Sequence, residues 1–214
     1  MMRLRGKPWA AGEVQANPLH IAEPTSMQGK WHALFGNNNG ICVEIGCGKG
    51  AFILETALRN PQLNFIAIER EQKIIAMAMK AARTCDTPLT NLRFIWGDAN
   101  KLSTYFADAE LQRIYINFCD PWRNRIKWHK RRLTHRGYLE VYKRLTAHSE
   151  LFFKTDSEDL YRFSARELRE TGWTLRNTTE DLHNSGFEGN IMTEYETRFH
   201  ESGLPIYRLE AYIE

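Results

Sequence analysis

The chain has 214 residues, of which 43% are hydrophobic and 26% are charged, with a formal net charge of +3. These values are typical of one globular domain with a single core, and they exclude a disordered chain. No apolar run is long enough to span a bilayer, and the first residues lack the apolar segment of a signal peptide, so we expect a cytoplasmic protein with no membrane partner.

The cysteines and the charge distribution narrow the possible partners. Cys42, Cys47, Cys85 and Cys119 lack the paired spacing of a zinc site, so we expect neither a structural metal nor a disulfide framework. The net charge is too small to indicate nucleic-acid binding by itself. Residues 123–136, however, contain basic and aromatic side chains and no acid.

Residues 1–39 come first and end in the turn sequence Gly36-Asn37-Asn38-Asn39-Gly40. We expect them to form an irregular basic arm ahead of a single domain over residues 40–214. In that domain, apolar runs alternate with amphipathic segments, as in a parallel sheet covered by helices on both faces. The expected strands are Ile41–Ile45, Asn64–Glu69, Asn91–Trp96, Arg113–Phe118, Glu150–Lys154, Trp173–Thr178 and Pro205–Tyr212. The expected helices are Lys49–Arg59, Glu71–Thr84, Thr134–Leu145, Ser157–Thr171 and Thr193–Ser202. The predicted fold is therefore α/β, with a seven-stranded, mostly parallel sheet.

A glycine-rich loop follows the first expected strand and opens a helix. Its glycines, Gly46, Gly48 and Gly50, permit a tight turn and close approach of a ligand. Their spacing differs from the G-x-G-x-x-G fingerprint of nicotinamide dinucleotide sites, and Glu44 stands two residues ahead of them. A carboxylate there repels a pyrophosphate but attracts a ligand that carries an ammonium and a sulfonium. This combination points to S-adenosylmethionine, with a plain tight turn as the alternative.

Two further acids lie at the carboxyl ends of the next two expected strands. Glu69 lies where a carboxylate conventionally accepts the ribose hydroxyls of a nucleotide, and Asp98 can accept a hydrogen bond from an adenine amino group. Taken singly, each has a simpler explanation that is favoured: Glu69 as a solvated acid, and Asp98 as part of an ordinary Gly-Asp turn. Acids at the carboxyl ends of successive strands favour a common site, because ligands of open α/β sheets bind along that edge.

Several separated motifs carry a family resemblance. They are Arg3-Leu4-Arg5-Gly6-Lys7-Pro8-Trp9-Ala10, the glycine loop, Asn117-Phe118-Cys119-Asp120-Pro121-Trp122, Phe153-Lys154-Thr155-Asp156 and Asn190-Ile191-Met192-Thr193-Glu194-Tyr195-Glu196. In this order, over nearly the whole chain, they resemble the bacterial tRNA (guanine-N7-)-methyltransferases of the TrmB family.

The resemblance implies a Rossmann-like class I S-adenosylmethionine-dependent methyltransferase that forms 7-methylguanosine in the variable loop of tRNA. It places the cofactor contacts at Glu44, Glu69, Asp98 and Asp120. It places the substrate contacts at Asp156, Thr193, Glu194, Tyr195 and Glu196. Thr193 to Glu196 also form a helix capping box, in which Glu196 reaches back to the first residue, and Asp156 lies in a credible helix start.

The chain departs from the family pattern after the Asp-Pro-Trp motif. Arg123-Asn124 replaces the usual Pro-Lys, and, compared with the family pattern, one extra residue precedes Lys130-Arg131-Arg132. The family's substrate-binding lysine therefore corresponds to Asn124 by direct count, or to Arg125 if the insertion lies earlier.

The implied chemistry favours Asp120 as the catalytic residue. Guanine N7 has a free lone pair, so methyl transfer needs alignment more than a general base. The positive charge passes to the guanine ring, and a nearby carboxylate stabilises it. Whether Asp120 contacts the cofactor or the guanine is left open by the sequence. The basic stretch would hold RNA phosphates, with Trp122 or Trp128 stacking on a base, although such a stretch is often only a solvated face.

Two other functions remain as alternatives. An amino methyltransferase acting on a nucleobase uses a similar loop, but typically with two prolines where this chain has only Pro121. A non-catalytic RNA-binding subunit should have a broken cofactor loop, and this loop is intact. The sequence leaves open whether the protein is a monomer or a homodimer.

Overall fold

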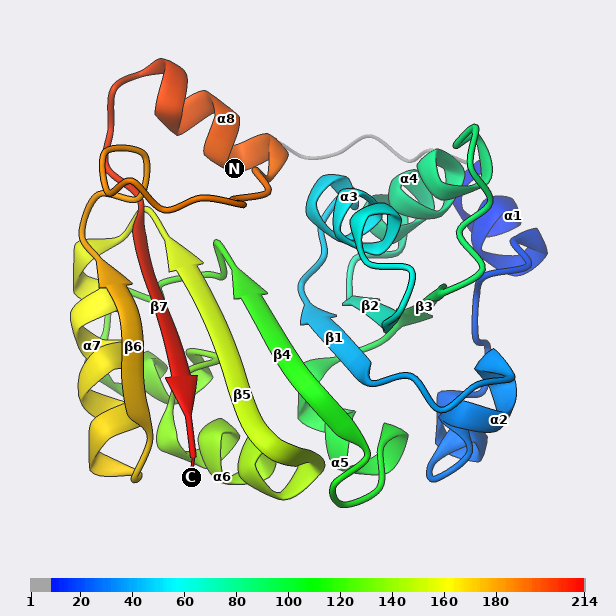
Figure 1. Cartoon of the computed structure of the whole chain (residues 1–214), viewed down its shortest axis with the longest axis horizontal. Coiled ribbons are helices and arrows are strands. Elements are labelled where there is room, and N and C mark those ends of the chain that lie inside the picture. Colours follow the sequence, from blue (N-terminus) through cyan, green and yellow to red (C-terminus); the bar gives the residue numbers. More distant parts are fainter. Residues whose placement is uncertain (1–8, 214) are drawn as a thin grey trace.

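A computed structural model describes residues 9–213 and contains a seven-stranded sheet in the order β3-β2-β1-β4-β5-β7-β6 (Figure 1). Strands β1 to β5 are parallel, whereas β7 runs antiparallel to both β5 and β6. The predicted fold class is thereby confirmed. The strands are β1 Ile41–Ile45, β2 Asn64–Glu69, β3 Leu92–Trp96, β4 Leu111–Asn117, β5 Thr146–Thr155, β6 Thr174–Thr179 and β7 Tyr207–Tyr212.

Helices cover both faces of the sheet. The α-helices are α1 Trp9–Ala16, α2 Trp31–Phe35, α3 Ala51–Arg59, α4 Gln72–Arg83, α5 Leu102–Tyr105, α6 Arg136–Leu145, α7 Glu158–Glu170 and α8 Glu194–Glu201. The short 3-10 helices are η1 Pro24–Met27, η2 Ala99–Lys101 and η3 Ile126–Arg131. One core lies under α1, α3 and α4, and the second lies under α5, α6 and α7 on the other face (Figure 1). Because the central strands are buried on both sides, they appear in the sequence as continuous apolar runs.

The longer predicted elements are all present, with ends that differ by a few residues. The largest difference is at β5, which begins at Thr146 instead of Glu150. Thr146 pairs with Leu111 of β4, and this pairing extends the strand over polar residues that show no apolar pattern. The short elements α5, η2 and η3 were missed, because three to six residues are too few to show a helical period.

The prediction of an irregular arm is wrong for the described residues 9–39. They contain α1 and α2, and α1 buries Ala10 and Val14 against α4. Trp31 is fully buried, and its Nε1 donates a hydrogen bond to the carbonyl of Tyr105 at 2.9 Å. Such helices are too short to be stable alone, so they form through packing on the domain. The motif residues 1–8 lie outside the described part of the chain.

The topology gathers several loops at one edge of the sheet. The parallel strands β1 to β5 all end at this edge, over which α8 lies (Figure 1). Between β1 and β4 the strand order reverses direction, and open α/β sheets bind their ligands at such a switch point. The loops after β1, β2, β3 and β4 are therefore the place to look for a site.

The buried Trp31 provides a test of this packing. Replacing Trp31 with Ala should lower the free energy of unfolding by about 3–5 kcal/mol, because it removes a fully buried ring and leaves a cavity. The same change at Trp9, which is 40% exposed, should cost less. Chemical denaturation of both variants measures the difference, and similar losses would contradict the structural role of Trp31.

Candidate active site

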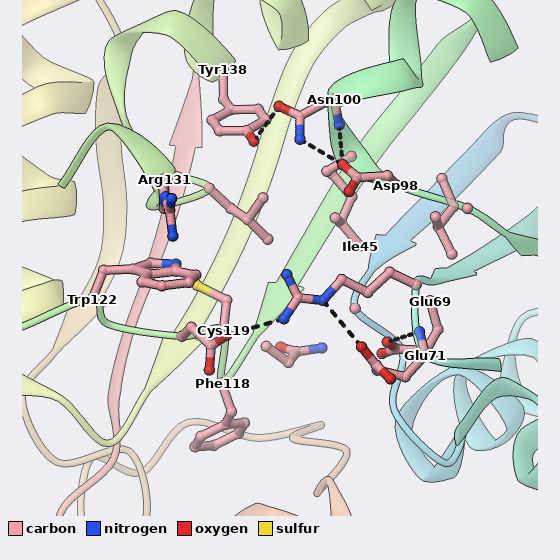
Figure 2. A pocket seen from close by; sticks show the side chains of 18 of the residues that line it. Ile45, Glu69, Glu71, Asp98, Asn100, Phe118, Cys119, Trp122, Arg131 and Tyr138 are labelled. Atoms are coloured by element: carbon pink, nitrogen blue, oxygen red, sulfur yellow. Dashed lines mark hydrogen bonds and ion pairs between the residues drawn. The ribbon is translucent and has the colours of Figure 1, made fainter. Parts of the chain in front are cut away.

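Two adjoining cavities lie at the carboxyl edge of the sheet, with volumes of about 640 Å³ and 310 Å³. Both are lined by Gly46, Asn117 and Phe118. The larger cavity extends toward β2 and β3, and Figure 2 shows it from close by. The smaller cavity lies between the glycine loop and the start of α8. Together they form one elongated site across the switch point.

The glycine loop has a backbone that other residues rarely adopt. Gly46, Gly48 and Gly50 have φ angles of 80°, 57° and 90°, all in the left-handed region. A Cβ on Gly50 would lie 2.9 Å from the Cβ of Ala78, so helix α4 also requires glycine there. Glu69, the last residue of β2, helps to fix the loop, because its Oε2 accepts a hydrogen bond from the Gly48 amide at 3.3 Å.

Glu44 is buried at the switch point and only half of its carboxylate is satisfied. Its Oε1 accepts a hydrogen bond from Asn117 Nδ2 at 2.9 Å, whereas Oε2 has no hydrogen-bond partner among the described residues. Burial raises the pKa of Glu44 to about 7, opposed by the Asn117 hydrogen bond and the charge of Lys154. A buried, half-paired carboxylate favours a ligand that brings a positive charge and a donor.

Glu69 and Asp98 line the larger cavity on the side formed by β2 and β3 (Figure 2). Glu69 Oε1 accepts a hydrogen bond from the Glu71 amide at 2.9 Å. Asp98 Oδ1 accepts two hydrogen bonds from Asn100, at 2.8 Å from the amide and 2.7 Å from the side chain. These bonds fix the direction of both carboxylates along the cavity wall.

Asp120 lies at the mouth of the same cavity, and its side chain is 67% exposed. Its Oδ2 is 3.8 Å from Arg70 Nη2, and Arg70 is also 3.8 Å from Glu71. Pairs this long and this exposed contribute little stability, so Asp120 is open to other partners. Sequence reasoning missed Arg70, because its position after Glu69 carries no motif.

The loop after β4 has a strained backbone, and Arg132 holds it in place. Phe118 and Trp122 have φ angles of 53° and 45°, which are uncommon for residues other than glycine. Arg132 is buried, donates to the Pro121 carbonyl at 2.8 Å and forms an ion pair with Asp159 of α7. One member of the basic stretch thus anchors the loop instead of facing solvent.

Neither Asn124 nor Arg125 is among the described residues that line the two cavities. The basic residues that line the larger one are Arg70, Lys130 and Arg131. Arg131 lies over the Trp122 ring, 4.9 Å from its centroid, on the side of the cavity opposite Glu69 (Figure 2). Lys130 and Arg131 had appeared in the sequence only as members of the basic run, because η3, which directs them, gives no clear pattern.

The predicted cap at the start of α8 is confirmed only in part. Thr193 Oγ1 accepts a hydrogen bond from the Glu196 amide at 2.9 Å, as in a capping box. The prediction that Glu196 reaches back to Thr193 is wrong, because its buried carboxylate accepts hydrogen bonds from Lys154 and Asn190, each at 2.6 Å. A buried cation competes better for a carboxylate than a backbone amide does.

The remaining predicted substrate residues lie near the smaller cavity. Thr193, Glu194 and Tyr195 line it, and Glu194 forms an ion pair of 2.7 Å with Lys49 of the glycine loop. The Tyr195 ring lies 5.4 Å from that of Phe118. Asp156 directly follows β5. Burial of Tyr195, together with the nearby negative charge of Asp156, raises the pKa of this tyrosine.

Helix α7 does not use Asp156 as its cap. Its cap is Ser157, whose Oγ accepts a hydrogen bond from the Leu160 amide at 3.2 Å. The predicted helix start is therefore confirmed, with Asp156 next to the cap residue.

Residues 9–213 contain no group of three or more His, Cys, Asp or Glu side chains that could hold a metal ion. Within the same range, no helix has both the length and the apolar character needed to cross a membrane.

Comparison with known proteins agrees with this geometry. Residues 38–209 match a family model described as a putative methyltransferase. The fold is similar to that of the 16S rRNA methyltransferase KamB, with a TM-score of 0.62, 14% identity, and coverage of 87% of this chain and 93% of that one. The chain is 43% identical to a tRNA (guanine-N(7)-)-methyltransferase of Halalkalibacterium halodurans, covering 98% of this chain and 95% of that protein. It is 47% identical to the protein of the same name from Clostridioides difficile, over 86% of each. The chain belongs to the tRNA (guanine-N(7)-)-methyltransferase family.

Proposed function

We propose that this chain transfers a methyl group from S-adenosylmethionine to N7 of a guanine in the variable loop of tRNA, in the cytoplasm. The observation that carries the proposal is the Glu44 carboxylate, which is buried at the switch point with one oxygen unpaired in the described part of the chain, in a protein of this family. A pyrophosphate ligand would be repelled there, whereas the ammonium of an amino-acid end would balance the charge of Glu44.

The residues that line the two cavities are suited to each part of this cofactor. Glu44 and the glycine loop would hold the amino-acid end, Glu69 the ribose hydroxyls, and Asp98 the adenine amino group. The larger cavity, of about 640 Å³, lies within the usual size range of small-molecule sites. When bound, S-adenosylmethionine supplies an activated methyl group on a cationic sulfonium.

Positioning by the protein is the main catalytic requirement. Guanine N7 loses no proton in the reaction, so the protein needs to align the base and stabilise the positive charge that arrives on it. Asp120 is suited to this role, because it lies at the mouth of the larger cavity with only a long, exposed pair to Arg70. Tyr195 and Phe118 present aromatic rings beside the smaller cavity, where a planar base could pack.

A cluster of aromatic and basic side chains supports RNA as the substrate. The rings of Trp122 and Trp128 lie 6.1 Å apart, and Arg125 lies over Trp128 at 5.1 Å from the ring centroid. Arg131 lies near both rings, at 4.9 Å and 6.0 Å. Guanidinium groups and indole rings bind phosphates and unstacked bases, and this cluster adjoins Asp120. We propose Asn124 or Arg125, with Asp156, Thr193, Glu194 and Tyr195, as further substrate contacts.

A modified substrate tests the position of methylation. A tRNA transcript with 7-deazaguanine at the target has no N7 lone pair, so it should accept no methyl group from labelled S-adenosylmethionine. The unmodified transcript is the control. Unchanged methylation of the modified transcript would instead support an amino methyltransferase, and no methylation of either would support a non-catalytic RNA-binding subunit.

The pKa of Glu44 leads to a prediction about cofactor affinity. The ammonium of the amino-acid end binds the ionised carboxylate, so affinity should fall as the pH drops below about 7, where Glu44 takes up a proton. Glu44→Gln should weaken binding by roughly 1.5–3 kcal/mol and remove this pH dependence. Calorimetry at several pH values measures both effects. Unchanged affinity in the variant would remove Glu44 from the site.

Asp120 should act mainly on the rate. Asp120→Ala should lower single-turnover methylation by about a hundredfold or more, the scale of one lost preorganised electrostatic contact. Asp120→Asn keeps the shape and removes the charge, so it should be similarly slow if the charge matters. Unfolding curves check that both variants fold, and near-normal turnover in either would contradict the role assigned to the charge.

Arg125 should contribute more to tRNA binding than Asn124 does. Arg125→Ala removes a cation and a contact with Trp128, and we expect the KM for tRNA to rise about tenfold, equivalent to about 1.4 kcal/mol. Asn124→Ala should have a smaller effect. Lys127→Ala, in the same exposed stretch, is the control for general phosphate attraction, which weakens as salt increases. A larger effect at Asn124 would reverse the assignment.

A further inference from the structure

Buried charged side chains cross the sheet beneath the carboxyl edge. They are Glu44 on β1, Lys154 on β5, Arg208 and Glu210 on β7, and Glu196 on α8. Glu196 pairs with Lys154 at 2.6 Å, and Arg208 pairs with Glu210. Glu44 is the member left without a pair in the described part of the chain. Buried ions normally occur in pairs, and this group of buried side chains has one carboxylate, Glu44, more than it has cations.

Lys154 uses its hydrogen bonds on the segment that leads into α8. Its Nζ donates to Glu196 Oε2 at 2.6 Å, to the Ile191 carbonyl at 2.8 Å and to Asn190 Oδ1 at 3.1 Å. An ammonium has three hydrogens, so these acceptors use all of them. Lys154 therefore fixes the start of α8, which carries Tyr195 over the smaller cavity.

Lys154 also acts on Glu44, through its charge. Lys154 is the partner of Asn117 in the β4–β5 ladder, and Asn117 Nδ2 donates to Glu44 Oε1. The positive charge of Lys154 favours ionised Glu44, while Glu69, from β2, disfavours it. Glu196, on α8, forms its ion pair with the same Lys154 ammonium group. One buried ammonium is thus shared between a carboxylate of the cofactor site and a carboxylate of α8.

We propose that Lys154 is a positioning residue for both halves of the active site: its charge supports the Glu44 carboxylate toward the amino-acid end of the cofactor, and its hydrogen bonds hold the substrate-facing start of α8. This inference rests on the proposed function, because it takes Glu44 as the contact for the amino-acid end. It also assigns Glu196 to the support of α8, beneath the surface that meets the substrate, since Glu196 is fully buried.

Variants at the two ends of the ion pair should have different effects on ligand binding. Lys154→Met removes the charge that supports Glu44, so Glu44 becomes harder to ionise and binding of the amino-acid end weakens. Glu196→Gln removes the competitor for Lys154, so Glu44 keeps its support or gains some. A purely structural ion pair would instead respond alike to the loss of either partner.

The experiment is calorimetric binding of S-adenosylhomocysteine and of 5′-methylthioadenosine, which lacks the amino-acid end. Lys154→Met should weaken binding of S-adenosylhomocysteine about fivefold at pH 7, the effect of raising the pKa of Glu44 by about one unit, and binding should recover as the pH is raised. This variant should leave binding of 5′-methylthioadenosine unchanged. Lys154→Arg, which keeps the charge, should bind S-adenosylhomocysteine like the wild type. Glu196→Gln should not weaken S-adenosylhomocysteine, but should raise the KM for tRNA.

Each outcome bears on the proposal. Equal weakening of both ligands by Lys154→Met, or weakening of S-adenosylhomocysteine by Glu196→Gln, would overturn it. If Lys154→Met does not fold, the variants Lys154→Arg and Glu196→Gln still test the proposal. A purely structural ion pair would make Glu196→Gln bind S-adenosylhomocysteine more weakly, whereas the proposal expects no weakening. Glu44→Gln separates the two levels of inference. If it binds S-adenosylhomocysteine normally, the proposed cofactor placement fails, whereas weak binding there with normal binding in Lys154→Met defeats the present inference alone.

Discussion

The burial of the Glu44 carboxylate between β1 and β4 is the constraint around which the site is arranged. A charge at the centre of a sheet needs compensation, and residues 9–213 supply only one hydrogen bond, from Asn117. The site is therefore built with a deficit of positive charge, which raises the pKa of Glu44. The ammonium of the proposed cofactor would relieve this deficit, so burial of Glu44 would favour binding of a cationic group.

The loop after β4 shows how a basic stretch is divided between structure and function. Phe118 and Trp122 hold unfavourable backbone angles, and Arg132, buried against Phe163 and bonded to Pro121, keeps the loop in place. Arg136, which ends the stretch, pairs with Glu167 and Glu170 of α7, so the basic residues left for the proposed contact with RNA are those between Arg123 and Arg131. Strain of this kind persists only where surrounding contacts over-determine the backbone, and it is concentrated at functional sites.

Helix α8 connects the substrate side of the site to its interior. Two acids in its first turn form ion pairs in opposite surroundings. The exposed Glu194 pairs with Lys49 of the glycine loop, and solvent weakens this interaction. The buried Glu196 pairs with Lys154 with almost no solvent exposure. The buried pair fixes the start of the helix, whereas the exposed pair contributes little stability.

The sequence alone determined the α/β fold, the glycine loop and the family, because alternating apolar periods and ordered motifs are local properties of the chain. It also located Glu44, Glu69 and Asp98, since acids at strand ends meet at one edge in any parallel sheet. Only the tertiary structure decided that Glu196 is buried, that Arg132 anchors the loop after β4, and that α1 and α2 are helices. These features depend on partners distant in the chain, such as Lys154, whose proximity follows from strand pairing and packing and leaves no local signal.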